Sequence, residues 1–278
     1  MPKGDRERRA PRQYVLAVES TEWLTPHLVR VVASGGTLDG FGGEGYTDAY
    51  VKLLFVDPAL GLEPPYDLAA LRATLPADRL PVVRTYTVRW VDRTRRRLAI
   101  DFVTHGDTGV AAVWAAGAAP GDRLVLSGPG GAYAPDPAAG WHLFAGDLSA
   151  LPAIAAALET LPGHANGVAH VEVGAAADIL DLKVPEQVAV NWLVNPDPAD
   201  TGFLARAVDG GPWPAGPYGA GAVQVFAHGE RESVKAVRQV LRDRGVPREA
   251  ISISGYWARG RTEDVFQAEK REPVGRID

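Results

Sequence analysis

The first half of the chain consists of short β-type segments separated by turn residues. Between residues 14 and 131, six runs are rich in β-branched and aromatic residues and are bounded by Gly, Pro and Asp. They read YVLAVES, LVRVVAS, AYVKLLFV, VRTYTVRW, RLAIDFVTH and DRLVLSG. Helices are predicted at residues 67–74 and 109–117. Strands at this spacing predict a six-stranded antiparallel Greek-key β-barrel, because closure of the sheet removes its unpaired edges.

The pattern changes after residues 132–140, which are rich in Pro, Ala and Gly and have no apolar period. We interpret them as a linker. In residues 141–257, strand patterns such as WHLFAGD and VAHVEVGA alternate with helix patterns such as ALPAIAAALETL and SVKAVRQVLRDR. This alternation predicts an open, mostly parallel α/β domain with helices on both faces of its sheet. We also expect a flexible arm at residues 1–13 and a charged tail at residues 258–278.

Composition narrows the possible functions. The 278 residues carry a formal net charge of −5, which argues against nucleic-acid binding. The absence of cysteine excludes disulfides and cysteine-held zinc or iron–sulfur centres, so redox chemistry would need an organic cofactor or a bound metal complex. The six histidines show no metal-ligand spacing, and we expect no protein-held metal. Without a signal peptide or a long apolar run, we expect a cytoplasmic protein with no membrane insertion.

A motif of charged, aromatic and hydroxyl residues, RTYTVR, lies inside the fourth predicted strand. In a strand, alternate side chains share a face, so Arg84 and Tyr86 point one way while Thr85 and Thr87 point the other. An aromatic ring can lie on a flat heterocycle, a cation can meet a phosphate, and a threonine hydroxyl can bond a polar ring edge. These are the contacts that a bound flavin needs. The simpler alternative is a charged outer face with Tyr86 in the core.

The segment DFVTHGDTGVAAVWA places a glycine-containing loop between a strand and a helix. Glycine lets the backbone approach a ligand closely, and the free N–H groups at a helix start attract anions. A pyrophosphate would fit here, with Thr108 and residues 109–112 around it. A polar loop that caps an ordinary helix is the alternative reading.

Taken in order along the chain, these segments resemble those of the siderophore-interacting protein family, whose members are ferredoxin-reductase-like flavoproteins. The resemblance covers almost the whole chain, through DAYVKLLFVDP, RTYTVR, DFVTHGDTGVAAVWAAGAAPGDRLVLSGPGG, GDLSALPAIAAALETLP, FAHGERESVKAVRQVL and ISGYWARGRTEDVFQAEKRE. It implies that the barrel binds FAD and that the α/β domain binds NADH or NADPH. The FAD contacts that it implies in the barrel domain are Arg84, Thr85, Tyr86, Thr87, Asp101, Phe102, Val103, His105, Thr108, Gly109, Ala111 and Ala112.

The resemblance also implies contacts in the second domain. Asp147 and Ala150, after its first strand, would lie on the adenosine side of FAD, although Leu148 and Ser149 stand where the family usually has an acidic residue and a threonine. The Gly229–Glu230 pair follows the strand VQVFAH and resembles the family's nicotinamide-side loop. It would lie at the carboxyl end of the sheet, where such folds bind ligands. The chain has no GxGxxG fingerprint, so the choice between NADH and NADPH stays open.

Basic residues are the candidates for binding the substrate. Lys52 lies within an apolar strand, and because a buried lysine is costly, we expect it to face a cavity or the rim of the barrel. The resemblance implies that basic residues near the flavin receive a negatively charged ferric siderophore. Lys52, Arg259 and Lys270 are the candidates, and Trp257 is expected to shield the flavin. The alternative for most of the tail is a solvated helix with local ion pairs.

The resemblance therefore implies an FAD-dependent reductase that takes hydride from NAD(P)H and reduces siderophore-bound Fe(III) to Fe(II). Two other functions stay open. The chain could be a general NAD(P)H:flavin or quinone reductase on the same scaffold, or a non-catalytic protein that binds flavin or siderophore. We expect a monomer, and the sequence leaves the identity of the siderophore open.

Overall fold

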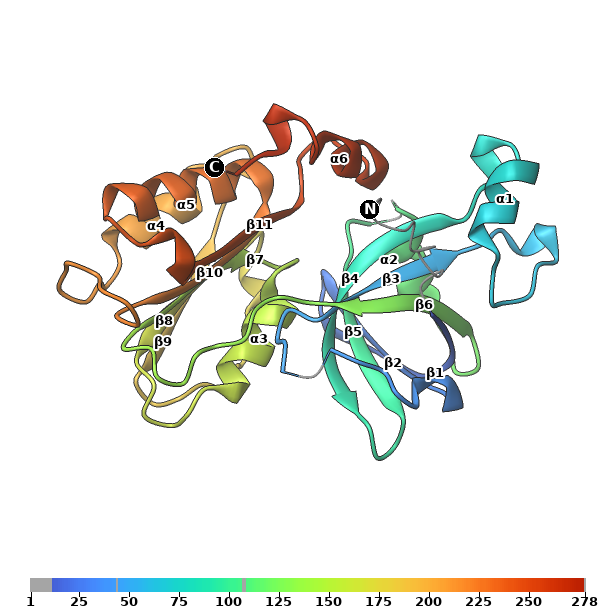
Figure 1. The fold of residues 1–278 in the computed structure, drawn as a ribbon, viewed down its shortest axis with the longest axis horizontal. Coiled ribbons are helices and arrows are strands. Elements are labelled where there is room, and N and C mark those ends of the chain that lie inside the picture. Colours follow the sequence, from blue (N-terminus) through green and yellow to red (C-terminus); the bar gives the residue numbers. More distant parts are fainter. Residues whose placement is uncertain (1–11, 44, 107–108, 278) are drawn as a thin grey trace, which may run out of the picture.

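A computed structural model describes residues 12–43, 45–106 and 109–277 of the chain. A β-barrel and a parallel α/β sheet lie side by side, and the C-terminal segment lies near the top of the junction between them (Figure 1). The arm expected at residues 1–13 lies almost wholly outside the described residues.

The barrel is a closed antiparallel sheet of six strands in the order β1-β2-β5-β4-β3-β6, which confirms the predicted fold class. Inward-facing positions on neighbouring strands alternate with outward ones, and residues such as Val29, Val31 and Ile100 have no exposed surface. The strands are β1 (Gln13–Thr25), β2 (Leu28–Ser34), β3 (Tyr50–Phe55), β4 (Val82–Asp92), β5 (Arg97–Val103) and β6 (Arg123–Gly130).

Strand β1 is longer than its apolar pattern predicts, because it continues through the polar residues after Ser20. In this part it pairs with β2, with Glu22 opposite Arg30 and two irregularities in register. An antiparallel ladder tolerates polar side chains on its solvent face, so hydrogen bonding to β2 extends the strand where hydrophobicity alone would end it.

Two helices belong to the barrel domain. Helix α1 (Leu68–Thr74) begins after Asp67, whose carboxylate accepts the backbone N–H groups of Ala69 and Ala70 at 3.1 and 3.0 Å. Helix α2 (Val110–Gly117) follows β5 and packs Ala111 and Ala115 against the barrel core. The packing fixes the start of α2 next to the end of β5.

The second sheet has five parallel strands in the order β11-β10-β7-β8-β9. Helix α3 covers the face that turns toward the barrel, while α4 and α5 cover the other face. The chain changes direction between the neighbours β7 and β10, and this switch point opens the carboxyl edge of the sheet to ligands. The elements are β7 (His142–Asp147), α3 (Leu151–Thr160), β8 (Gly167–Val173), β9 (Val188–Val194), α4 (Phe203–Gly210), β10 (Gln224–Glu230), α5 (Arg231–Asp243) and β11 (Ile251–Trp257).

Apolar and charged contacts join the two domains. Leu28 of the barrel is fully buried in the same hydrophobic cluster as α3, and Arg89 of β4 forms an ion pair with Glu159 of α3 at 2.5 Å. The ring of His27, next to Leu28, lies 2.9 Å from the buried carboxylate of Asp178. These contacts set the barrel strand β4 against the second domain.

The C-terminal segment follows β11 and contains the short helix α6 (Glu263–Glu269), which lies above the junction of the two domains (Figure 1).

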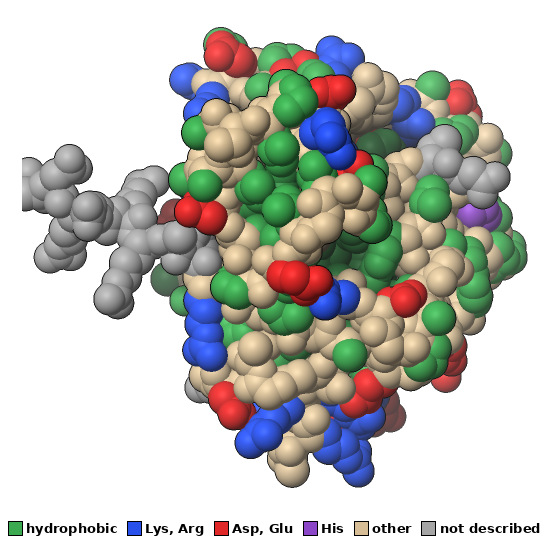
Figure 2. Space-filling model, turned by 90° about the vertical axis from the view of Figure 1, so that its right-hand side faces the viewer, with side chains coloured by type: hydrophobic (Ala, Val, Ile, Leu, Met, Phe, Trp, Pro, Cys, Tyr) green, Lys and Arg blue, Asp and Glu red, His purple; other side chains and the backbone are tan. Residues whose placement is uncertain are grey.

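Viewed from the barrel end, hydrophobic side chains gather in a hollow bordered by acidic and basic side chains (Figure 2). The remaining short elements are the 3-10 turns Gly36–Leu38, Pro58–Leu60, Ala77–Arg79, Ala176–Asp178, Arg248–Ala250 and Pro273–Gly275.

Candidate functional site

Strand β4 presents the motif that the sequence singled out. The ring of Tyr86 packs inward, with its centroid 4.5 Å from that of Phe102, and burial raises the pKa of its hydroxyl to about 12. The Arg84 guanidinium is 21% exposed, donates to the carbonyl of Val83 at 2.8 Å and lies 3.7 Å from Asp264 of α6. A neutral aromatic ring and an accessible cation therefore lie two residues apart on one face of the strand.

The other face of β4 turns toward the second domain and the C-terminal segment. Thr85 pairs with Lys52 across the β3–β4 ladder, and Thr87 pairs with Tyr50. Lys52 and Tyr50 are exposed, whereas Thr87 is buried. Lys52 thus opens onto the surface instead of entering the barrel core.

The turn between β5 and α2 forms a backbone cradle. Gly106 and Gly109 have φ values of +63° and +83°, and nothing lies within 4 Å of the position that a Cβ atom would take at either residue. Helix α2 has no side-chain cap, so the N–H groups of its first turn, which includes the buried Ala111 and Ala112, have no partner within the helix. These features suit a ligand that carries negative charge. Thr108, which the sequence also placed here, lies outside the described residues.

Strand β5 uses three successive residues for three different neighbours. The Asp101 carboxylate pairs with Arg30 of β2 through two hydrogen bonds of 2.7 and 2.8 Å. Phe102 has no exposed surface and supports Tyr86 from inside the barrel. Val103 packs against the hydrophobic cluster of the second domain. Direct ligand contacts of these residues and of the exposed His105 after them stay predictions, but the Asp101 carboxylate already has a protein partner.

Asp147 ties together the carboxyl ends of three strands in the second sheet. One carboxylate oxygen accepts the N–H of Ser149 at 2.9 Å, and the other accepts the N–H of Glu230 and the indole N–H of Trp257, both at 2.8 Å. Gly229 has φ +144°, and a Cβ atom there would lie 2.8 Å from the same oxygen. Glycine is therefore required at this position, and Ser149 supports Asp147 where the family pattern has another residue.

Glu230 serves as the N-cap of α5. Its carboxylate accepts the N–H groups of Glu232 and Ser233 at 2.7 and 2.9 Å, and its second oxygen accepts the N–H of Arg259 at 3.1 Å. Ala150 is fully buried and stands at the N-cap position of α3, where no side chain caps the helix. In the structure, the carboxylates of Asp147 and Glu230 form hydrogen bonds with other parts of the protein. Their contacts with adenosine or nicotinamide stay predictions.

Among the described residues, no group of three or more His, Cys, Asp or Glu side chains is arranged to hold a metal ion. The same residues contain no helix of the length and apolarity needed to cross a bilayer.

Two family models match the two halves of the chain. The model described as "Siderophore-interacting FAD-binding domain" matches residues 17–133, and the model "Siderophore-interacting protein" matches residues 139–260. The chain belongs to the siderophore-interacting protein family.

Relatives of this siderophore-interacting protein match along nearly the full chain. An uncharacterized protein of Mycobacterium tuberculosis is 47% identical over 269 residues, which cover 93% of this chain and 95% of the relative. Ferric vibriobactin reductase ViuB of Vibrio cholerae is 37% identical over 268 residues, covering 95% of each chain. The crystal structure of a siderophore utilization protein from T. fusca is 35% identical, with a TM-score of 0.76 and coverage of 90% of this chain and 94% of the other.

The barrel of this siderophore-interacting protein fits the FAD that its family model implies. The start of α2 at Gly109 offers open space beside backbone N–H groups that have no partner within the helix, and Arg84 offers a partly exposed cation, so the barrel carries groups that suit a pyrophosphate. Tyr86 offers an aromatic ring, held by Phe102, beside the hydroxyl groups of Thr85 and Thr87. The donor set therefore agrees with a flavin dinucleotide.

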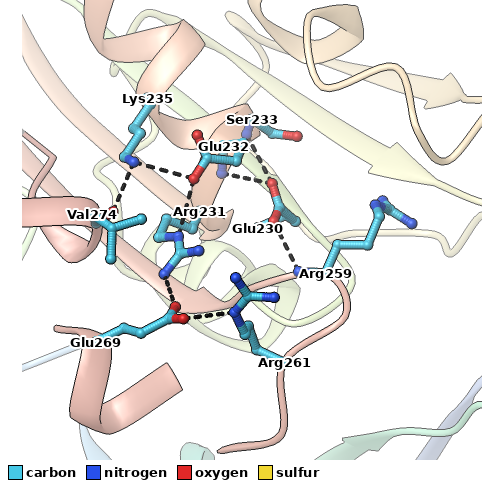
Figure 3. Close-up of polar contacts among 9 residues, drawn as sticks. All are labelled: Glu230, Arg231, Glu232, Ser233, Lys235, Arg259, Arg261, Glu269 and Val274. Atoms are coloured by element: carbon cyan, nitrogen blue, oxygen red, sulfur yellow. Dashed lines mark hydrogen bonds and ion pairs between the residues drawn. The ribbon is translucent and has the colours of Figure 1, made fainter. Parts of the chain in front are cut away.

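The three candidate substrate cations lie in two places. Lys270 follows α6; burial lowers its pKa, Glu263 raises it, and the positive charge of Lys52 lowers it further, so the two lysines are electrostatic neighbours. Arg259 instead lies over the ring of Trp257, with 5.6 Å between the guanidinium carbon and the ring centroid, and extends away from the tail cluster in Figure 3. Lys270 thus follows a helix that Asp264 holds against Arg84 of the barrel, whereas Arg259 lies at the edge of the second sheet.

The sequence did not reveal which residues hold the tail over the barrel. Asp264 meets Arg84, and Glu269 meets Arg231 and Arg261, although the members of the first pair lie 180 positions apart. Acidic and basic residues are common in the tail, and no periodicity selects those that pair with distant elements.

Proposed function

We propose that this protein is an FAD-dependent reductase that takes hydride from NADH or NADPH and reduces the Fe(III) of a ferric siderophore to Fe(II). One observation carries the proposal: β3 and β4 place the exposed cation Lys52 directly across the ladder from the flavin motif. A flavin held at β4 would therefore lie beside a positive surface that attracts an anionic iron complex. Family membership and the ferric vibriobactin reductase relative support the same chemistry.

The chain's own residues provide binding and orientation. The first turn of α2 and Arg84 would hold the pyrophosphate, Tyr86 would lie against the ring system, and the Thr87 hydroxyl would bond its polar edge. When bound, FAD supplies the chemistry of accepting two electrons as hydride and releasing them singly. The donor gives up its hydrogen as hydride and the acceptor takes electrons alone, so the one proton released per hydride can pass to water and the site needs no general acid or base.

The acceptor side of the site is proposed to consist of Lys52 and Lys270. Their charges would draw in an anionic ferric complex and hold it near β4. Reduced iron carries less charge and binds hard oxygen donors less strongly, so Fe(II) would leave the siderophore. We propose that the nicotinamide donor binds at the carboxyl edge of the second sheet, at Gly229 and Glu230. A reductase that uses this donor would work in the cytoplasm, where NADH and NADPH are available. Both domains and both lysines come from one chain, which suits a monomer.

A visible absorption spectrum tests this proposal. The protein loaded with FAD is titrated anaerobically with NADH or NADPH, and then mixed with a ferric tris-catecholate, ferric citrate or a quinone. We expect bleaching by one nicotinamide and fastest reoxidation by the ferric tris-catecholate. Equal reoxidation by a quinone would favour a general reductase. A protein that holds FAD but is bleached by neither nicotinamide would favour a binding protein or another electron donor.

A further inference from the structure

The C-terminal segment, residues 258–277, has few means of holding its position by itself. Helix α6 has seven residues, a length at which isolated helices are unstable in water. Its buried apolar anchor is Phe266, which is 1% exposed. Polar contacts with α5 and the end of β10 must therefore contribute to its placement, and Figure 3 shows two arginines at one carboxylate of the segment.

That carboxylate belongs to Glu269, the last residue of α6. One of its oxygens accepts from Arg231 at 2.5 Å and the other accepts from Arg261 at 2.6 Å (Figure 3). Arg231 is the first residue of α5, and its side chain is 6% exposed. A buried guanidinium needs anionic partners, so Arg231 strongly favours the position of Glu269 that the structure shows.

Two more contacts fasten the segment on either side of Glu269. The Lys235 ammonium donates to the carbonyl of Val274 at 2.8 Å, and Glu230 accepts the N–H of Arg259 at 3.1 Å. The segment is thus attached to α5 before and after α6, with Glu269 at the point where the chain turns. The residue at that turn controls where the next residue lies.

On the barrel, Lys52 pairs across the β3–β4 ladder with Thr85, the neighbour of Arg84. On the C-terminal segment, the residue after Glu269 is Lys270. Its ammonium lies 4.8 Å from the ring centroid of Phe266, so its direction is set from the tail side. At the other end of α6, Asp264 lies 3.7 Å from Arg84, which places the helix against the barrel. The helix therefore carries Lys270 toward the strands that present Lys52, and two positive charges on one side of the domain junction suit the binding of an anion.

We propose that Glu269 is a positioning residue that fixes Lys270 beside Lys52 and so sets the affinity of the protein for anionic ferric complexes. The proposal rests on the proposed function for the identity of the ligand. It assigns Glu269 no contact with the ligand or the cofactor. Glu269 acts through its two arginine partners, which tie the end of α6 to α5.

The test separates positioning from general damage by double substitution. Variants E269Q, K270Q and E269Q/K270Q are compared with E272Q, which changes an exposed carboxylate three residues further along the same segment. Calorimetric titration measures the dissociation constant of redox-inert gallium(III) tris-catecholate, which is anionic, and of gallium(III) tris(acetohydroxamate), which is uncharged. The titration is done with flavin-loaded and flavin-free protein, and steady-state KM and kcat follow for the iron(III) complexes.

We expect E269Q and K270Q each to raise the dissociation constant of the tris-catecholate by about five- to tenfold, the size expected for losing one well-placed charge. The double variant should be no weaker than K270Q alone, because Glu269 acts through Lys270. KM for the anionic iron complex should rise while kcat and the binding of the uncharged complex stay unchanged. R261Q should reproduce part of the E269Q effect, and R261K should restore binding. Thermal unfolding checks that each variant is folded.

Three outcomes would overturn the proposal. They are E269Q behaving like E272Q, full additivity of the E269Q and K270Q effects, and equal weakening of the binding of both gallium complexes. The proposed function fails in a different way: wild-type protein would bind the gallium tris-catecholate but would not reduce its iron counterpart. The positioning role of Glu269 would then still be measurable as a binding effect.

Discussion

Asp264 of α6 lies 3.7 Å from Arg84 of β4, so the C-terminal segment touches the strand that carries the flavin motif. The Asp264 side chain is 79% exposed, and that of Arg84 is 21% exposed. An ion pair so open to water stabilises by about 1 kcal/mol or less. The Arg84 guanidinium can therefore exchange Asp264 for a phosphate group at little cost in free energy. The C-terminal segment and the cofactor thus compete for the same cation.

Substitutions at this pair should change FAD affinity in opposite directions. Arg84→Gln removes a charge-assisted hydrogen bond and should weaken FAD binding by about 1.5–3 kcal/mol, roughly ten- to a hundredfold. Asp264→Asn removes a competitor for the same guanidinium and should tighten binding by less than about fivefold. Flavin fluorescence during titration of the FAD-free protein measures both. Weaker binding by the D264N variant would show that the carboxylate orients Arg84 toward the cofactor.

The backbone cradle at the start of α2 gives a second prediction. Gly109 has φ +83° and open space around its missing Cβ, so alanine there meets no neighbour but is strained. Gly109→Ala should destabilise the protein by about 1–2 kcal/mol and weaken FAD binding, because relaxation of the strain would move the N–H groups of α2.

Gly117→Ala is the matched control for this substitution. Gly117 is the last residue of α2, has no positive φ and also has open space around it. Alanine there should leave FAD binding unchanged and should leave stability unchanged or slightly higher. Chemical denaturation and FAD titration of the two variants give the comparison. Equal effects on FAD affinity would show that the cradle does not hold the cofactor.

The barrel and the parallel sheet were predictable because their signals are local. Strand β2 and helix α1 lie where short β-type and helical segments were predicted, and the flavin motif fills consecutive positions of one strand. Neighbours in the sequence remain neighbours in a strand or a helix turn, so these features need no knowledge of tertiary contacts.

Contacts between distant segments could not be predicted in this way. The pairing of the Asp101 carboxylate with Arg30 depends on the β2–β5 register, which brings these residues together, and the expected contact of Asp101 with the cofactor stays a prediction. Glu269 carried no signal because many acidic residues surround it in the tail. Asp147 was expected to contact adenosine, and its role in joining three strand ends depends on the order of strands in the sheet.

The junction at Asp147 gives a third prediction. Gly229→Ala would place a Cβ atom 2.8 Å from the Asp147 carboxylate at φ +144°, so the carboxylate must move away from the indole N–H of Trp257. The loss of buried hydrogen bonds and the strain together should cost about 2–4 kcal/mol of stability. Urea unfolding measures the cost, and a shift in tryptophan fluorescence reports the lost bond. Gly219→Ala, which has open space and no positive φ, should leave both unchanged.

A buried histidine predicts how stability changes with pH. His170 of β8 is 2% exposed, both of its ring nitrogens lack a hydrogen-bond partner among the described residues, and burial lowers its pKa to about 4. The unfolded chain binds the proton at a pKa of about 6.5, so the unfolded state binds more protons over the window between these values. The contribution of His170 to the free energy of unfolding is therefore fully present above about pH 6.5. It is lost as pH falls toward 4, at up to about 1.4 kcal/mol per pH unit.

His170→Leu should flatten this slope, because leucine has a similar size and takes up no proton. Urea midpoints measured at half-unit steps from pH 7 to pH 4 would show a smaller fall for H170L than for the wild-type protein. The same substitution at the exposed His164 supplies the comparison. Identical slopes for H170L and wild type would mean that His170 becomes protonated in the folded state, which would require a partner or water at its ring. A gain in stability at pH 7 would in addition measure the cost of burying a polar ring without hydrogen bonds.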